Sequence, residues 1–349
     1  MSEMPATQGG GLQPAPSWPR GNDFQPRGLL ANGHVQTMLS SSSFRRMAQR
    51  PLRRVLAQGA EPVLFEVEGG VRLSGVFTRQ RAGEHSRGLA VLFHGWEGST
   101  DSSYVVQIGA RLLADGWDVF RLNFRDHGDT HHLNTELFHS CMLDEVVAAV
   151  KEAERRWHEP GKPVTLTGFS LGGNFALRVA MVAPEAGLDL DHVVSVCPVI
   201  DPGAGLFSLE HAPWVYHWYF MRKWTHSLRR KQKLFPEELF VRPSELRKGL
   251  RELTQILIER RTPMRTLDDY LEGYSVAGAR MARMQVRTTI LTARNDPVIP
   301  VSDFERLTLS PAIELDIADH GGHCGFLRDW HFHSFTDDYI AARFNSLAS

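Results

Sequence analysis

Residues 168–172 have the spacing of a nucleophilic serine site. They read Gly-Phe-Ser-Leu-Gly and match Gly-x-Ser-x-Gly, in which a serine stands on a sharp turn between a strand and a helix. The two glycines let strand and helix approach without Cβ clashes, so the serine hydroxyl is lifted clear of the sheet. An ordinary glycine-rich turn is the alternative, but residues 163–167 have the pattern of a buried strand and residues 174–180 that of a helix. We therefore predict that Ser170 is a nucleophile for acyl chemistry.

A nucleophilic serine needs a histidine base and an acid that orients the base. Asp296 follows the apolar run 286–292, so we expect its carboxylate just beyond the end of a strand. His323 lies in a glycine-rich loop near the C-terminus. The chain order serine, acid, histidine suits a serine site on a parallel sheet, and we predict Asp296 as the acid and His323 as the base. Asp201 is the competing acid, His320 is the lesser candidate for the base, and the alternative for His323 is an ordinary loop histidine.

The oxyanion formed during acyl transfer needs two backbone amides as hydrogen-bond donors. The amide of Leu171, the residue after the nucleophile, is the first expected donor. The second should come from the loop 94–99, His-Gly-Trp-Glu-Gly-Ser, where we predict the amide of Trp96. The side chain of His94 in this loop need not react, and a structural role is the alternative to a contact with the substrate.

Short apolar runs alternate with helical patterns over most of the chain. The runs cover residues 88–93, 117–123, 163–168, 192–199 and 286–292, and the helical patterns 104–114, 144–157 and 175–182. Continuous apolar runs are typical of parallel strands that are buried on both faces. A β-hairpin with a Gly69-Gly70 turn precedes them. The sequence therefore predicts an α/β fold with a doubly wound, mostly parallel sheet, and ligands at the carboxyl ends of its strands.

The alternation stops between residues 201 and 285, where we expect a helical cap inserted into the sheet domain. This segment carries 15 Lys and Arg against 10 Asp and Glu, so its charge is positive while the rest of the chain is negative. It also contains an aromatic cluster: Phe207, Trp214, Tyr216, Trp218, Tyr219, Phe220 and Trp224. We predict that Trp214 and Tyr219, with His94 and Phe169, contact the substrate; the alternative is that the cluster only packs the cap on the sheet.

The domain organisation follows from these boundaries. We predict an N-terminal arm and extension over residues 1–55, a core formed by residues 56–200 and 286–349, and the cap at 201–285. The first 28 residues lack a basic segment leading into an apolar stretch, so they have the pattern of a flexible arm and not of a secretion signal.

The chain resembles the α/β-hydrolase fold superfamily and, within it, the YheT-like branch, which includes membrane-attached animal relatives. The resemblance is carried by residues 32–37 (Asn-Gly-His-Val-Gln-Thr), 94–99, 168–172, and Asp-Pro at 296–297 with Gly-Gly-His at 321–323. It implies a serine hydrolase of carboxylic esters, often lipid-like, with a triad of Ser170, Asp296 and His323. The loop 125–132 departs from the shorter segment of the family, and the membrane helix of the animal relatives is absent.

The predicted function is therefore a carboxylic ester hydrolase, esterase- or lipase-like, that works through an acyl-enzyme. An acyltransferase that uses the same acyl-enzyme is one alternative, and a non-catalytic ligand-binding protein of the same fold is another. We expect no organic cofactor and no metal. His127, Asp129, His131 and His132 could ligate a divalent ion, but polar residues that fix the edge of the pocket are the favoured interpretation.

Composition limits the partners and the compartment. The chain has 349 residues with 39 Lys and Arg against 40 Asp and Glu, a balance that argues against nucleic acid as a partner. We expect a small-molecule ester as the partner and no transmembrane segment. The basic run 229–233 allows peripheral contact with a membrane, but it is also the pattern of a solvated helix face. The 3 cysteines are far apart, which favours a reducing, cytoplasmic location over a disulfide framework. The oligomeric state, the acyl chain length and the alcohol part of the ester are not determined by these patterns.

Overall fold

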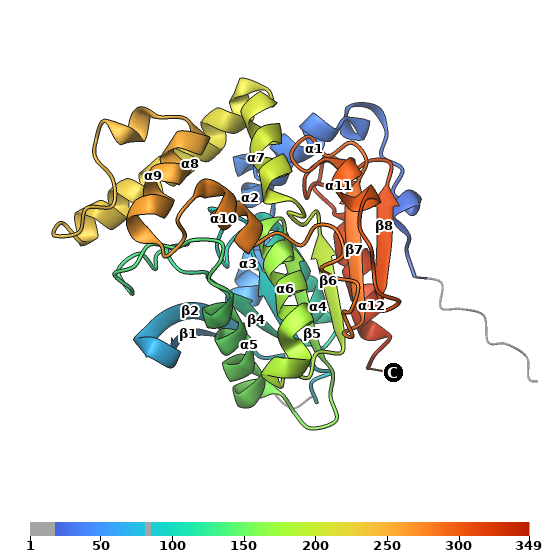
Figure 1. The fold of residues 1–349 in the computed structure, drawn as a ribbon. Helices are drawn as coiled ribbons and strands as arrows, with labels where there is room; N and C mark the ends of the chain where they lie inside the picture. The colour runs from blue at the N-terminus through green and yellow to red at the C-terminus, as the bar shows by residue number, and fades with distance from the viewer. Residues whose placement is uncertain (1–17, 81–84, 349) are drawn as a thin grey trace, which may run out of the picture.

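The computed structural model describes residues 18–80 and 85–348, and an eight-stranded sheet runs through its centre (Figure 1). The strands follow the spatial order β1-β2-β4-β3-β5-β6-β7-β8. Their bounds are β1 Ala60–Val67, β2 Val71–Thr78, β3 Leu89–Phe93, β4 Asp118–Leu122, β5 Val164–Phe169, β6 His192–Val196, β7 Thr288–Ala293 and β8 Ile313–Ala318. Strands β1 and β2 form the expected antiparallel hairpin and β2 pairs antiparallel with β4, whereas all other neighbours are parallel. The predicted mostly parallel α/β sheet is confirmed.

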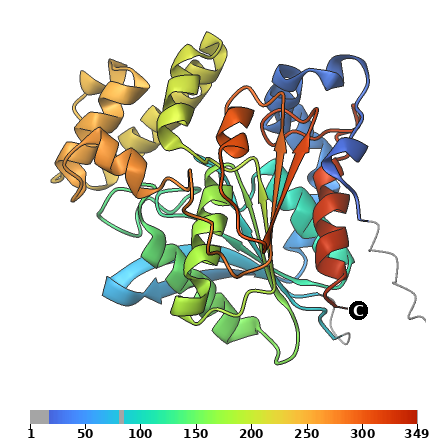
Figure 2. The ribbon, with the colours of Figure 1, turned by 45° about the vertical axis from the view of Figure 1, so that its right-hand side comes forward.

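Helices cover both faces of this sheet, as its apolar runs require. Side chains of β3 alternate between two apolar clusters: Val91 packs in the cluster of α5 and α6, and Leu92 in the cluster of α4 and α12. These helices are α4 Ser103–Ala114, α5 Leu143–Trp157, α6 Leu171–Ala186 and α12 Phe335–Asn345. Both side chains are fully buried. Figure 2 shows the sheet and the helices on its two faces from a second direction. The doubly wound arrangement brings the carboxyl ends of the parallel strands to one edge.

A group of helices is inserted between β6 and β7 and lies beyond that edge, at the upper left of Figure 1. It consists of α7 Pro202–His211, α8 Trp214–Leu234, the 3₁₀ turn η4 Glu245–Arg247, α9 Leu250–Arg261 and α10 Leu267–Gly273. Two apolar clusters pack these helices together, and Trp96 from the sheet domain joins one of them. We call residues 202–273 the helical insertion; that it is a cap domain in its own right stays a prediction.

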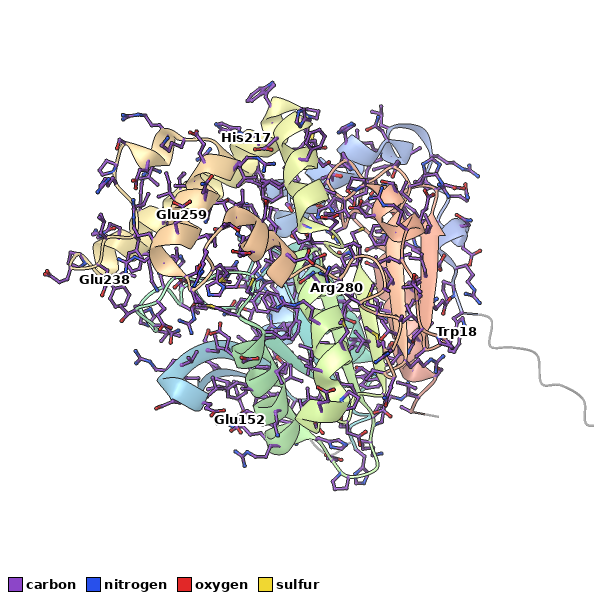
Figure 3. All side chains as sticks on the ribbon, viewed as in Figure 1. Trp18, Glu152, His217, Glu238, Glu259 and Arg280 are labelled. Atoms are coloured by element: carbon purple, nitrogen blue, oxygen red, sulfur yellow. The ribbon has the colours of Figure 1, made fainter. Side chains whose placement is uncertain are left out.

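The N-terminal segment packs against β8, α12 and α4. Its elements are η1 Gly21–Asp23, η2 Gly28–Ala31, α1 Gly33–Ser40, α2 Ser43–Ala48 and α3 Arg50–Ala57. The amide of Gly21 donates to the Asp316 carboxylate on β8 at 2.7 Å, and Arg343 on α12 donates to the carbonyl of Pro19 at 3.1 Å. Trp18 lies beside β8 in Figure 3. Part of the predicted arm, from Trp18, is thus fixed on the sheet domain, while residues 1–17 lie outside the described residues.

Candidate active site

Ser170 stands on the turn between β5 and α6 with a backbone that few side chains adopt. Its φ and ψ are 55° and −119°, a strained combination that directs the hydroxyl away from the sheet. The flanking glycines make the turn possible. A Cβ added at Gly168 would lie 2.1 Å from the Gly172 carbonyl oxygen, and one added at Gly172 would lie 2.2 Å from the His94 carbonyl oxygen. The spacing of the motif is therefore fixed by backbone contacts, as the sequence pattern predicts.

Three predicted residues from distant parts of the chain meet in one hydrogen-bonded relay. Ser170 Oγ lies 2.8 Å from His323 Nε2, and His323 Nδ1 lies 2.9 Å from Asp296 Oδ2. The other carboxylate oxygen of Asp296 accepts hydrogen bonds from the amides of Val298 and Ile299, at 2.8 and 3.1 Å. Because the carboxylate accepts the Nδ1 proton, Nε2 is left to accept the proton of the serine hydroxyl. The geometry is that of a nucleophile, a base and an orienting acid.

The electrostatics of the relay favour a charged imidazole. Burial alone would lower the pKa of His323, but the charge and the hydrogen bond of Asp296 outweigh it and raise the pKa above its usual value. The Asp296 side chain is fully buried, so its attraction for the imidazolium is weakly screened. An imidazolium formed when serine gives up its proton is therefore stabilised.

Helix α1 and the 3₁₀ turn η2 before it hold the loops that carry Asp296 and His323. The amide of His323 donates to Thr37 Oγ1 at 2.8 Å. Gln36, which is fully buried, binds both the amide and the carbonyl of Leu327 at 2.8 and 2.9 Å. Asn295 donates to the carbonyl of Ala31 and accepts from the amide of Gly322, both at 3.0 Å. We expected no role for these residues, although the motif 32–37 was the signal that could have revealed one.

Two backbone amides beside Ser170 are free to bind an oxyanion. Among the described residues, neither the Trp96 amide nor the Leu171 amide has a hydrogen-bond acceptor, whereas the neighbouring Gly95 amide donates to the Tyr104 hydroxyl at 3.0 Å. A Cβ added at Gly95 would lie 3.3 Å from the Cβ of Ser170, so this loop passes directly against the serine.

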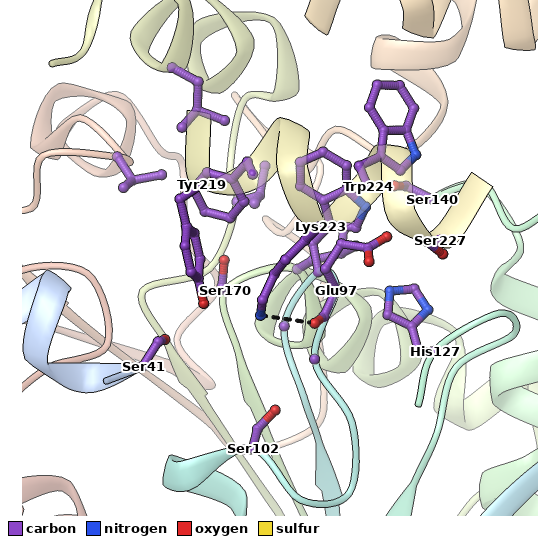
Figure 4. A pocket seen from close by; sticks show the side chains of 18 of the residues that line it. Ser41, Glu97, Ser102, His127, Ser140, Ser170, Tyr219, Lys223, Trp224 and Ser227 are labelled. Carbon is purple, nitrogen blue, oxygen red and sulfur yellow. Dashed lines mark hydrogen bonds between the residues drawn. The ribbon is translucent and has the colours of Figure 1, made fainter. Parts of the chain in front are cut away.

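Ser170 opens into a cavity of about 1380 Å³ beneath the helical insertion. Figure 4 shows Tyr219, Lys223 and Trp224 of α8 around the same cavity. Trp96 stacks on Phe220 of α8 with ring centroids 5.6 Å apart. The loop that carries one free amide therefore packs against the insertion that encloses the cavity.

Of the four predicted substrate contacts, only Tyr219 lines this cavity. His94 is fully buried behind it: its Nδ1 lies 2.7 Å from the Gly95 carbonyl and its Nε2 accepts from the Phe124 amide at 3.2 Å. The structural role is the one that fits His94. Phe169 is buried against Tyr104, and Trp214 is 76% exposed at the start of α8. The prediction for these three residues needs correction, because the local sequence pattern of a strand, helix or loop does not determine which of its side chains face the cavity.

The competing candidates make other contacts. Asp201 Oδ1 caps α7 by accepting from the Gly203 and Ala204 amides, and His320 Nδ1 lies 3.0 Å from the Ala31 carbonyl. The residues weighed as metal ligands do not converge. His127 Nδ1 binds a backbone carbonyl at 2.7 Å, and the Asp129 side chain is 95% exposed. The interpretation of the loop as the polar edge of the pocket fits these contacts.

The fold and the serine turn together define an α/β-hydrolase. The family described as "Serine aminopeptidase, S33" matches residues 84–326, and the chain belongs to this family of α/β-hydrolases. The chain is 25% identical over 314 residues to "Putative esterase YheT" of Escherichia coli, and the aligned region covers 87% of each of the two chains. Within the family, the chain is therefore a YheT-like member. Among solved structures, the fold is similar to an esterase of Pyrococcus furiosus, with TM-score 0.53, 18% identity and 83% and 91% of the two chains covered. It is also similar to 2,6-dihydroxy-pseudo-oxynicotine hydrolase, with TM-score 0.55, 16% identity and coverages of 90% and 77%.

Within residues 18–80 and 85–348, none of the helices is long and apolar enough to span a bilayer.

Proposed function

We propose that the protein hydrolyses carboxylic esters through Ser170, His323 and Asp296. The observation that carries this proposal is the unbroken relay from Ser170 Oγ through the imidazole to a buried carboxylate, with separations of 2.8 and 2.9 Å. The relatives named as esterases support ester cleavage as the reaction.

The relay performs the reaction in two half-reactions. Ser170 Oγ attacks the ester carbonyl carbon while its proton passes to His323 Nε2. The amides of Trp96 and Leu171 bind the resulting oxyanion. His323 then gives the proton to the departing alcohol, which leaves an acyl group on Ser170. A water molecule, deprotonated by His323, attacks this acyl carbonyl; the carboxylic acid departs and Ser170 recovers its proton.

The walls of the cavity support an acyl ester as the substrate class. Its lining includes Leu206, Leu250, Leu257 and Ile258 of the helical insertion. These side chains belong to the apolar clusters of the insertion. A lining of this kind favours an extended hydrocarbon chain as the ligand, because binding removes apolar surface of both the chain and the cavity from water.

A second serine–histidine pair in the cavity provides the control for the test. His131 Nε2 lies 2.7 Å from Ser227 Oγ, and both residues line the cavity. However, no group among the described residues partners His131 Nδ1, and burial lowers the pKa of this imidazole to about 3. An imidazole this weakly basic, without an orienting acid, is a poor base for Ser227.

The test is intact mass spectrometry after reaction with a fluorophosphonate, which labels activated serines with little substrate selectivity. We expect one adduct on the wild type and on Ser227→Ala, and none on Ser170→Ala. A panel of p-nitrophenyl esters of increasing acyl length then defines the chain length, and an added alcohol distinguishes hydrolysis from acyl transfer by the appearance of a new ester. An adduct that persists in Ser170→Ala, or turnover of aminoacyl anilides in preference to every ester, would overturn the proposal.

A further inference from the structure

Two of the three cysteines lie beside the histidine of the relay. The Sγ atoms of Cys197 and Cys324 and one ring nitrogen of His323 all lie within 4.8 Å of one another. Within residues 18–80 and 85–348, no other group of three or more histidine, cysteine, aspartate or glutamate side chains comes close enough together to share a metal ion. All three side chains are buried, with Cys197 at 0%, Cys324 at 5% and His323 at 8% exposure.

The backbone holds the two thiols in place. Cys197 and Cys324 have φ values of 45° and 56°, in the left-handed region that residues other than glycine rarely adopt. The Cys197 amide donates to the carbonyl of Leu291 at 2.8 Å, and the Cys324 amide donates to Cys197 Sγ at 3.5 Å. Because these contacts fix both residues next to the histidine, little chain entropy would be lost when a ligand joins the three side chains.

The hydrogen bonds that the two thiols make to backbone carbonyls are long. Cys197 Sγ lies 3.6 Å from the Gly322 carbonyl, and Cys324 Sγ lies 3.8 Å from the Val196 carbonyl. His323 and Cys324 also line the cavity, so an ion that enters it reaches the group without unfolding of the chain. Thiolate sulfur and imidazole nitrogen are the ligands that soft and borderline ions such as Zn²⁺ prefer.

We propose that Cys197, Cys324 and His323 bind one soft divalent metal ion, with Zn²⁺ as the best match, and that the bound ion inhibits the enzyme. In a tetrahedral zinc site the ligand atoms are about 3.4–3.8 Å apart, so the side chains need to close by only about 1 Å. Both thiols release their protons to solvent, and the two thiolates balance the charge of the ion. The fourth position is left for water from the cavity.

Inhibition rests on the proposed function of His323. If the ion binds Nδ1 it displaces the hydrogen bond to Asp296, and if it binds Nε2 it displaces the hydrogen bond to Ser170. With either nitrogen occupied the imidazole cannot transfer a proton between serine and substrate. Binding of the ion itself does not depend on any catalytic role.

The experiment reads metal binding and catalysis separately. Full-length protein is kept reduced with a phosphine, which excludes a disulfide, and is titrated with Co²⁺ and with nitrilotriacetate-buffered Zn²⁺. Binding is followed by the thiolate-to-cobalt absorption band and by the metal content after dialysis, and catalysis by ester turnover or fluorophosphonate labelling. The variants are Cys197→Ser, Cys324→Ser and Ser170→Ala, with Cys141→Ser as the matched control because Cys141 contacts Tyr270, away from the relay.

We expect one Co²⁺ per chain with a thiolate band in the wild type, Cys141→Ser and Ser170→Ala. The band should disappear in Cys197→Ser and Cys324→Ser. Zn²⁺ should inhibit Cys197→Ser at least a hundredfold less potently than the wild type, and EDTA should restore the wild type. The absence of a band in the wild type, equal bands in Cys197→Ser, or equal zinc inhibition of the wild type and Cys197→Ser would overturn the proposal. A band in a protein that hydrolyses no ester would leave the metal site standing and reject the proposed function.

Discussion

Replacement of Lys231 by Met should uncouple the helical insertion from the sheet domain. Lys231 lies on α8, its side chain is fully buried, and its Nζ donates to Asp126 Oδ1 at 2.7 Å. It also donates to the backbone carbonyls of Asn134 and Glu136 at 2.6 and 3.0 Å. Burial lowers the pKa of Lys231 and raises that of Asp126, and each shift is opposed by the attraction of the partner. The pair is therefore a buried charged anchor between α8 and the loop after β4.

The magnitude follows from the groups that Met would leave behind. Removal of one partner from a buried ion pair costs about 3–5 kcal/mol, because the other charge stays buried and unpaired. In Lys231→Met/Asp126→Asn no charge is left, and the remaining cost is that of unpaired carbonyls, about 1–3 kcal/mol. The double variant should therefore be more stable than Lys231→Met alone, by about 2 kcal/mol.

Urea unfolding followed by circular dichroism measures these differences. With a slope near 3 kcal/mol per molar urea, the midpoint of Lys231→Met should fall by about 1 M. Arg230→Met is the matched control on the same helix, since Arg230 pairs with an Asp129 side chain that is 95% exposed. An exposed pair contributes about 0.2–1 kcal/mol. The reasoning is refuted if Lys231→Met unfolds at the same urea concentration as Arg230→Met, or if the double variant is the least stable of the set.

Three further predictions concern the site. Ser170→Ala should lower kcat by about 10⁴-fold or more in an ester assay with no fall in the urea midpoint, because it removes the nucleophile but no packing contact. Asp296→Asn should lower kcat by about 10⁴-fold; it should also move the acidic limb of kcat/KM from above pH 6.5 to lower pH, because the carboxylate raises the pKa of His323. Gly172→Ala should lose activity and about 1–3 kcal/mol of stability, since the new Cβ would lie 2.2 Å from a carbonyl oxygen. Gly205→Ala on α7 is the control: its new Cβ would have its nearest neighbouring atom 3.9 Å away, so activity and stability should both stay intact.

A specific result would contradict each of these three predictions. Retained turnover in Ser170→Ala would place the nucleophile elsewhere. An acidic limb that stays in place in Asp296→Asn would mean that this carboxylate does not set the pKa of the base. Equal effects of the two glycine replacements on the midpoint and on kcat would show that the close backbone contact at the serine turn is not what requires glycine.

The sequence by itself predicted the serine turn, the three residues of the relay and the sheet that carries them. The serine turn is a local feature: strand, five-residue motif and helix are contiguous, and the periodicity of each is set by its own neighbours. The buried parallel strands were equally readable because both faces of β3 and β5 are covered, which leaves unbroken apolar runs. The prediction did not include strand β8, which is half-buried along most of its length. Its residues 313–316 alternate between Ile, Glu, Leu and Asp, so it lacks the continuous apolar run from which the other parallel strands were predicted.

Only the tertiary structure decided which neighbours surround Ser170, Asp296 and His323. Thr37 and His323 are separated by 286 positions, yet one hydrogen bond between them fixes the loop that carries His323. Cys197 and Cys324 are similarly distant, and no local pattern pairs them. The direction of a side chain toward or away from the cavity, as for Tyr219 and Trp214, depends on how α8 is rotated against the sheet domain. Such contacts arise from packing between segments far apart in the chain, whereas periodicity reports only on the residues within a few turns or strands of one another.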